Sequence, residues 1–295
     1  MKHRLTFRLS AILSFLLLST LLTKAFASPH SGRDVKEFEK TVDLANDGRL
    51  RLDTFKGSIK ISAWNREEVQ IYAKIEADES VSRDYAEESV EATEVRVRES
   101  GSSVSIKSDY DDVPSESSLF GFGQSKVLPY VHYEIRAPKN IRLTVDDYKS
   151  EIRLDGFDGR IYVESYKGTL DAEQMSGELE IDTYKGEFSV ADFRGSIEAK
   201  TYKGEIIVDL LELDGRSRLE TSKGYIRINA PSSLRADLVA ELGKRADFRS
   251  DFDIPRSRSS RRWRDDDEQD FQASINGGGP ELYLKSTKGT IRLSK

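Results

Sequence analysis

The sequence predicts an all-β protein, a parallel β-helix or β-solenoid with about 18 residues per coil. Three observations predict this fold. A Tyr-Lys-Gly motif recurs at a constant interval, at 166–168, 184–186 and 202–204; glycines divide that interval in half; and apolar residues alternate with other residues after most of these glycines. Alternation with a period of two is typical of a half-buried strand. Each interval, called one repeat below, should therefore supply two short strands and two turns.

The repeats occupy residues 141–230, which we expect to form the regular core of the domain. The first copy has Ser150 where the others have Gly, and the fifth has Ser222 where the others have Tyr. Two strands of this length cannot bury an apolar face alone, so the copies should stack with equivalent strands paired in parallel about 4.8 Å apart. The five copies are residues 145–154, 163–172, 181–190, 199–208 and 219–228, and two outlying segments, 52–61 and 284–293, match the same pattern.

An antiparallel β-sandwich or barrel is the alternative fold, because strands nine residues apart also suit a meander. Stacking is favoured because the same side chains return in every repeat, as they do when coils lie on top of one another.

The alternation also predicts which side chains face inward. Each motif contributes one inward apolar residue, with the Thr or Ser two positions later also inward, and a second apolar row fills the core at the other turn. The Tyr and Lys of each motif should point outward and form a ladder on the surface. The first inward row is Val145, Val163, Ile181, Ala199 and Leu219; the second is Phe157, Met175, Phe193 and Leu213; the external ladder is Tyr148, Tyr166, Tyr184 and Tyr202 beside Lys149, Lys167, Lys185 and Lys203.

The residues before the repeats belong to the same domain. Residues 34–80 alternate as strands do, 81–94 read as a short acidic helix, 108–126 as a loop, and 131–138 as a strand that ends at its proline.

The residues after the repeats include a segment without the pattern. Residues 253–272 contain a run of arginines around Trp263 followed by an acidic run, which predicts a flexible loop whose opposite charges compensate each other. An anion-binding, carbohydrate-binding or calcium-binding loop is the alternative interpretation. Residues 281–293 should form a last coil that closes the stack, since a bare end would expose unpaired strand edges.

The N-terminus predicts export. Residues 1–27 combine a basic start, an apolar run at 11–22 and an Ala25-Phe26-Ala27 cleavage site, which is the pattern of a signal peptide. The apolar run is shorter than the roughly 20 residues that a membrane span needs. The mature chain, residues 28–295, should have no transmembrane segment and should lie outside the cytoplasm, in the periplasm, at the cell surface or in the medium.

Composition excludes several classes of function. The chain has no Cys, which excludes disulfides, thiolate metal sites, a cysteine nucleophile and a lipid anchor on Cys. Its net charge of −6, with both signs mixed along the chain, argues against nucleic-acid binding. With three His and no phosphate loop or nucleophile elbow, we expect no cofactor and no metal.

Several short motifs, in this order, resemble the bacterial putative-adhesin family of exported β-strand-repeat proteins, whose domain has no settled function. They are Gly57–Ile61 followed by Trp64, the strand Val69–Tyr72, Tyr133–Lys139 before the repeats, and the Gly-rich turn before Lys288–Arg292. The resemblance covers nearly all of the mature chain. It implies a right-handed solenoid and an extracytoplasmic location, and it brings no catalytic motif.

Together these features predict a non-enzymatic cell-envelope protein, an adhesin-like structural or binding module that binds envelope polysaccharide or a protein partner. The tyrosines could stack on sugars, with the lysines binding anionic polymer. Alternatively, the ladder only packs on itself and stabilises the coils. The rival function is a polysaccharide-degrading enzyme on a β-helix, which needs paired carboxylates at a fixed separation. No signature selects such a pair, and residues 145–208 are uniform where an enzyme site would break the repeat.

Overall fold

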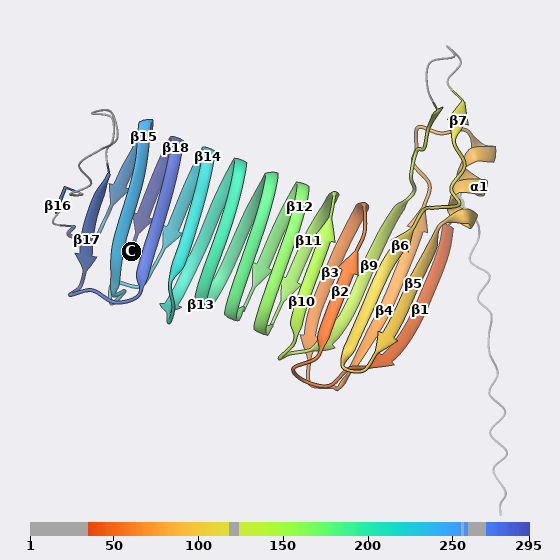
Figure 1. Ribbon diagram of the computed structural model, residues 1–295, viewed down its shortest axis with the longest axis horizontal. Coiled ribbons are helices and arrows are strands. Elements are labelled where there is room, and N and C mark those ends of the chain that lie inside the picture. The colour runs from red at the N-terminus through yellow and green to blue at the C-terminus, as the bar shows by residue number, and fades with distance from the viewer. Residues whose placement is uncertain (1–34, 118–123, 255–256, 259–269) are drawn as a thin grey trace, which may run out of the picture. The chain divides into compact units, whose positions relative to one another are not determined.

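The computed structural model describes residues 35–117, 124–254, 257–258 and 270–295. The predicted signal peptide, residues 1–27, and most of the loop predicted at 253–272 lie outside these residues. In the described part, all secondary structure except one helix is strand, as predicted (Figure 1). No helix in this part has the length and apolar character that crossing a membrane requires.

The elements before the repeats are nine strands and the helix. They are β1 (Val35–Asp43), β2 (Arg49–Asp53), β3 (Lys56–Trp64), β4 (Glu68–Glu76), α1 (Arg83–Ala92), β5 (Glu94–Ser100), β6 (Ser103–Asp109), β7 (Glu116–Ser117), β8 (Gln124–Ser125) and β9 (Tyr130–Pro138).

The repeats and the C-terminal part contribute the other strands. They are β10 (Arg142–Asp147), β11 (Lys149–Asp155), β12 (Asp158–Glu173), β13 (Ser176–Leu213), β14 (Ser217–Asn229), β15 (Ala236–Ser250), β16 (Ser257–Arg258), β17 (Phe271–Ile275) and β18 (Glu281–Ser294).

Sixteen of the described strands form one mixed sheet that does not close into a barrel, and β7 and β8 form a separate antiparallel pair. The main path runs β1-β4-β9-β3-β11-β12-β13-β14-β18-β15-β17-β16, with β10, β2, β6 and β5 branching from it. Between β3 and β15 the neighbours on this path pair in parallel, whereas the pairings at both ends include antiparallel ones.

The repeats pair in parallel with equivalent residues opposite each other. Val145 of β10 lies opposite Val163 of β12, and Gly168 of β12 lies opposite Gly186 of β13, an offset of one repeat in each case. Ala199 pairs with Leu219 because the fifth copy follows after a slightly longer interval than the others. The repeats therefore do not form the antiparallel meander that was the alternative.

The inward side chains are those that the alternation predicts. The first apolar row, Val145 to Leu219, is at most 1% exposed at every position. In the second row, Phe157, Met175 and Phe193 are at most 2% exposed and Leu213 is 8% exposed. These rows continue into the apolar side chains of the outlying copies, for example Ile59 and Ile291, in one buried cluster.

The predicted helix is present as α1, and local contacts define both of its ends. The side chain of Ser82 accepts a hydrogen bond from the amide of Tyr85, which is the arrangement of an N-cap. At the other end, Lys36 Nζ donates to the carbonyl oxygens of Glu91 and Thr93. This contact satisfies free carbonyl groups and places a positive charge at the negative end of the helix dipole.

Residues 281–293 do not form the last coil, so that prediction is wrong. Strand β18 lies between β14 and β15 and pairs in parallel with both. After β14, the next strand along the chain, β15, lies two strand positions away in the sheet. Strand β17 then pairs antiparallel with the outer edge of β15, and β18 occupies the position between β14 and β15. The outer edge of β15 is thus paired at residues 236–240, which protects a strand edge that would otherwise be open.

Two predicted loops also contain strands. In the segment 108–126, β7 pairs with β8. In the segment 253–272, β16 pairs with the first residues of β17, so the two ends of the predicted loop are held together.

Glycine is required where successive motifs stack most closely. Gly224 has φ +153°, and a Cβ added there would overlap the carbonyl oxygen of Gly204 in the preceding repeat. A side chain at this position would have to push two hydrogen-bonded strands apart, so Gly follows Lys in this copy of the motif.

Replacing Gly224 by Ala is therefore expected to lower the free energy of unfolding by about 3 kcal/mol or more, since it combines backbone strain with overpacking. Urea denaturation of residues 28–295 measures the effect. Tyr225→Ala is the control, because Tyr225 is adjacent and 52% exposed and its loss should cost about 0.5 kcal/mol. Equal midpoints for the two variants would contradict the steric argument.

Candidate functional site

The four predicted tyrosines form a continuous stack of rings across the repeats. Tyr148 lies between β10 and β11, Tyr166 lies in β12, and Tyr184 and Tyr202 lie in β13. Successive ring centroids are 5.0, 5.1 and 5.1 Å apart, with interplanar angles between 4° and 11°. Because parallel strands place equivalent residues about 4.8 Å apart, the backbone spacing itself brings the rings into stacking distance.

A fifth ring, missed in the sequence prediction, extends this stack. Phe55 lies with its centroid 4.6 Å from that of Tyr148 and with an interplanar angle of 5°. The signal was present in the outlying copy, where Phe55-Lys56-Gly57 stands in place of Tyr-Lys-Gly. At the other end, pairing of Lys203 with Lys223 puts Ser222 next to Tyr202, so the stack ends there. We call Phe55, Tyr148, Tyr166, Tyr184 and Tyr202 the ring ladder.

The rings of the ladder expose their edges to solvent, and stacking covers their faces. Its tyrosines are 41–43% exposed, and Phe55 is 36% exposed. In the middle of the ladder, however, both faces of each ring lie against neighbouring rings. A sugar that stacks on an aromatic face would have to separate these pairs. The ladder therefore offers phenolic hydroxyl groups and ring edges, and the stacking itself stabilises the coils.

The predicted lysines form a second line beside the rings. Lys149 lies opposite Lys56, Lys167 opposite Lys185, and Lys203 opposite Lys223. Lys149, Lys167, Lys185 and Lys203 are all exposed. Lys56 differs because its Nζ lies 2.7 Å from the Asp78 carboxylate and 4.0 Å from the Tyr130 ring centroid. This contact holds the pKa of Asp78 well below its usual range.

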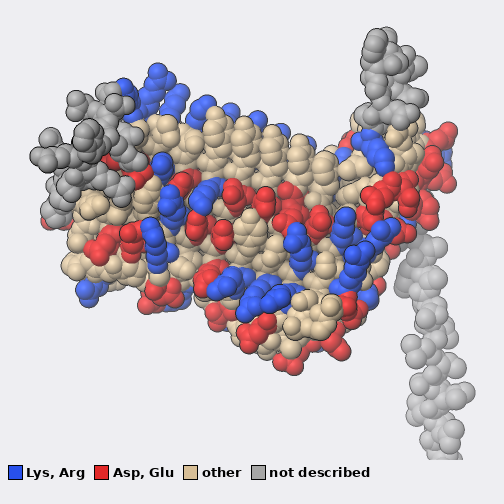
Figure 2. Space-filling model, viewed as in Figure 1, with Lys and Arg blue, Asp and Glu red and all other residues tan. Residues whose placement is uncertain are grey.

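A row of charged residues lies on the other side of the ring ladder. Side chains of both signs are visible over the strands of the face in Figure 2. The members of the row lie at equivalent positions of neighbouring strands. The side chains are acidic at the start of the row, and further along basic and acidic side chains alternate. Its members are Asp146, Glu164, Asp182, Lys200, Glu220 and Lys285.

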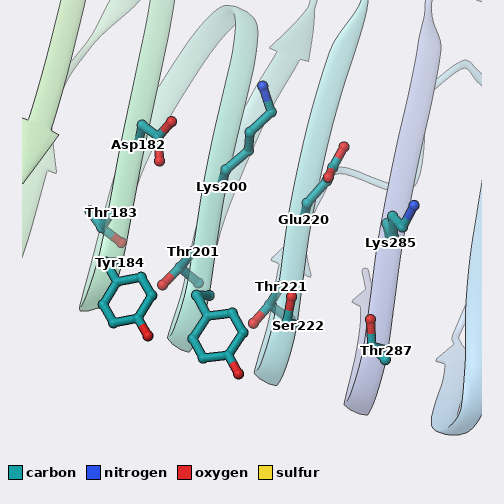
Figure 3. A pocket seen from close by; sticks show the side chains of 11 residues that line it. Asp182, Thr183, Tyr184, Lys200, Thr201, Glu220, Thr221, Ser222, Lys285 and Thr287 are labelled. Atoms are coloured by element: carbon teal, nitrogen blue, oxygen red, sulfur yellow. The ribbon is translucent and has the colours of Figure 1, made fainter. Parts of the chain in front are cut away.

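A groove is lined by this charged row and the ring ladder. One section, about 310 Å³, has Asp182, Lys200 and Glu220 along it, with Tyr184 further along its strand (Figure 3). A second section, about 500 Å³, is lined by Asp146, Glu164 and three rings of the ladder. The two sections share Asp182 and Tyr184, so the groove continues across several strands.

The hydroxyl row next to the groove is buried, as predicted. Ser165, Thr183, Thr201 and Thr221 are between 2% and 8% exposed. The equivalent residue of the first repeat is Asp147, which accepts hydrogen bonds from Ser150 Oγ (2.6 Å) and Ser165 Oγ (3.1 Å). Burial raises the pKa of Asp147 to about 6, although these hydrogen bonds favour the charged form.

Several carboxylates line the groove, and their pKa values and spacing decide whether it could support acid–base chemistry or bind a metal ion. Burial raises the pKa of Asp146, while the Arg51 guanidinium, 2.7 Å away, opposes that rise. Asp146, Glu164 and Asp182 occupy equivalent positions in successive repeats. Among the residues that the structure describes, no three His, Cys, Asp or Glu are grouped so that they could hold a metal ion.

Ring stacking should contribute measurably to stability. Tyr184→Leu is expected to lower the free energy of unfolding by about 1–2 kcal/mol and Tyr202→Leu by about half as much, because Tyr184 contacts two rings and Tyr202 one. A double-mutant cycle on Tyr166 and Tyr184 should give a coupling energy, whereas a cycle on Tyr148 and Tyr202, which do not touch, should give none. Equal coupling in both cycles would rule out direct stacking as its source.

Ionisation of Asp147 should destabilise the fold. Its pKa is higher in the folded state than in the unfolded chain, so its contribution to stability is present below the ordinary pKa and is lost as the pH rises through about 6. Asp147→Asn is expected to raise the free energy of unfolding by about 2 kcal/mol at about pH 8, with a smaller difference at about pH 4. Asp171→Asn, at an exposed position, is the control for the loss of one charge. A pH-independent difference would contradict the assignment.

The similarities to known proteins are remote. A scan against protein-family models and a search of curated proteins both find no match. Among solved structures, a "putative cell adhesion protein" from Clostridium sporogenes is 12% identical, with a TM-score of 0.38 over 88% of this chain and 99% of that one. A "putative adhesin" from Bacteroides fragilis is 10% identical, with a TM-score of 0.34 over 88% and 97%. A "putative lipid binding protein" from Parabacteroides distasonis is 11% identical, with a TM-score of 0.26 over 87% and 96%. At such identities and TM-scores, a function for this chain has to come from its own residues.

Proposed function

We propose that this chain is an exported, non-enzymatic β-solenoid of the bacterial cell envelope that binds envelope polysaccharide along its Tyr-Lys face. One observation carries the proposal: exposed tyrosine edges and exposed lysines recur side by side at equivalent positions of successive coils. A surface that repeats in one direction suits a ligand that also repeats in one direction, and a linear polysaccharide is such a ligand.

The solenoid architecture is supported by the parallel pairing of residues one repeat apart and by the two continuous buried rows. Export rests on the signal-peptide pattern of residues 1–27, with residues 28–295 as the mature domain. The resulting location is outside the cytoplasm: the periplasm, the cell surface or the medium.

Binding through the Tyr-Lys face would use Tyr148, Tyr166, Tyr184, Tyr202 and the lysine after each. Since the ring faces are covered, the tyrosines would contribute hydroxyl groups to hydrogen bonds with sugar hydroxyls. The lysines would contribute charge and further hydrogen bonds. The ladder then has two roles, because the stacking that stabilises the coils also holds the hydroxyls in a regular line.

The rival function is a polysaccharide-degrading enzyme, and one observation favours it. Asp146, Glu164 and Asp182 line the same groove, and the pKa of Asp146 is raised by burial. A glycosidase needs one carboxyl group as an acid and another as a nucleophile or base. The repeats around Glu164 and Asp182 are uniform, which supports binding without catalysis.

The test is co-sedimentation of residues 28–295 with purified peptidoglycan, envelope polysaccharide and membrane fractions. The wild type is expected to pellet with the polysaccharide, and a variant with Tyr148, Tyr166, Tyr184 and Tyr202 all changed to Ser should not, provided that circular dichroism shows it folded. A variant with Tyr72 and Tyr162, which lie outside the ladder, changed to Ser is the control and should bind like the wild type.

Two outcomes would contradict the proposal. Failure of the wild type to pellet with any fraction would make the ladder structural and favour a protein partner. Release of soluble fragments or new reducing ends from the polysaccharide would favour the enzyme.

A further inference from the structure

The lysine line is longer than the repeats indicate. Beyond Lys203 the pairing brings in Lys223 of β14, then Lys288 of β18, and then Arg245 of β15. The last two join in this order because β18 is inserted between β14 and β15. We call the seven residues Lys149, Lys167, Lys185, Lys203, Lys223, Lys288 and Arg245 the cation row.

The cation row is exposed, and the described residues do not neutralise it through ion pairs. All seven side chains are exposed. None of them forms an ion pair with any other residue that the structure describes. Elsewhere on the same coils charged side chains do pair, for example Arg160 with Glu178 and Lys200 with Glu198. The row stands out on a chain whose net charge is −6.

The spacing of the row makes this arrangement costly without a ligand. Neighbouring coils are about 4.8 Å apart, so seven cations form a line about 29 Å long. Like charges directly opposite each other on paired strands are destabilising. Two unit charges about 5 Å apart repel each other even in water, and salt screens that repulsion. An anionic polymer lying along the row would relieve it at every step.

Features beside the row favour a saccharide over other polyanions. The ring ladder supplies a parallel line of hydroxyl groups, which Ser222 and Thr287 continue past Tyr202. Hydroxyl groups can pair with the many hydroxyl groups of a sugar chain.

We propose that the cation row binds a linear acidic polysaccharide with one carboxylate on each sugar, laid across the coils. A pyranose unit is about as long as the distance between neighbouring coils, so carboxylates that face the row recur at a multiple of the coil spacing and can each meet a cation. The ring ladder acts beside the row as a rigid support that keeps the lysines in register. This inference rests on the proposed polysaccharide-binding function and specifies its ligand class.

The experiment measures binding of residues 28–295 to immobilised polygalacturonate, with dextran as the neutral polymer and a single-stranded oligonucleotide as a non-saccharide polyanion. We expect binding to polygalacturonate alone, and at least about tenfold weaker binding when NaCl rises from about 50 to about 300 mM. The test variant changes Lys167, Lys185 and Lys203 to Gln and should bind at least tenfold more weakly. The matched control changes Lys60, Lys107 and Lys139, exposed lysines outside the row, to Gln and should stay within about twofold of the wild type.

Each alternative result has a distinct meaning. Equal binding of dextran, or equal binding by the two triple variants, would overturn the inference. If the wild type still pelleted with envelope polysaccharide in either case, the proposed function would stand. Equal binding of the oligonucleotide would show a general polyanion surface and would overturn the assignment to a saccharide. Failure of the wild type to bind polygalacturonate and every envelope fraction would overturn both proposals.

Discussion

Parallel hydrogen bonding between strands one repeat apart is the constraint on which the rest of this structure depends. Once Val145 pairs with Val163 and Gly168 with Gly186, every equivalent side chain must lie in one line across the strands. Apolar residues then form continuous buried rows, and exposed residues form continuous surface rows. Gly204 and Gly224 are part of the same constraint, because the backbones approach too closely there for a side chain.

This constraint has opposite consequences for different residue types. For aromatic rings, a spacing of about 5 Å is favourable, and the ring ladder stabilises the coils. For lysines the same spacing concentrates charge of one sign, which is unfavourable without a partner. For hydroxyl-bearing residues it builds a buried line that one carboxyl group, Asp147, enters with its pKa raised to about 6. A surface with rows of such different character can bind a repeating ligand without any single specialised pocket.

At both ends of the sheet the simple stacking of parallel strands stops, and the new pairings cover strand edges. Near the C-terminus β17 covers part of the outer edge of β15. Near the N-terminus β9 is inserted between β3 and β4, and β1 is the edge strand. In both regions antiparallel pairings end the parallel series, so part of each terminal strand edge is covered and is not open for another chain to extend.

The sequence by itself determined most of the strands, the repeat interval, the inward rows and the external tyrosines and lysines, because each is a local pattern repeated at a fixed interval. Only the tertiary structure decided the order of the outlying copies. Which position β18 takes depends on long-range pairing with β14 and β15, and no local pattern encodes that choice. It decided equally that Phe55 joins the ring ladder, that the ring faces are covered, and that Lys288 and Arg245 extend the cation row. These properties belong to pairs of segments distant along the chain, and they exist only once those segments lie side by side.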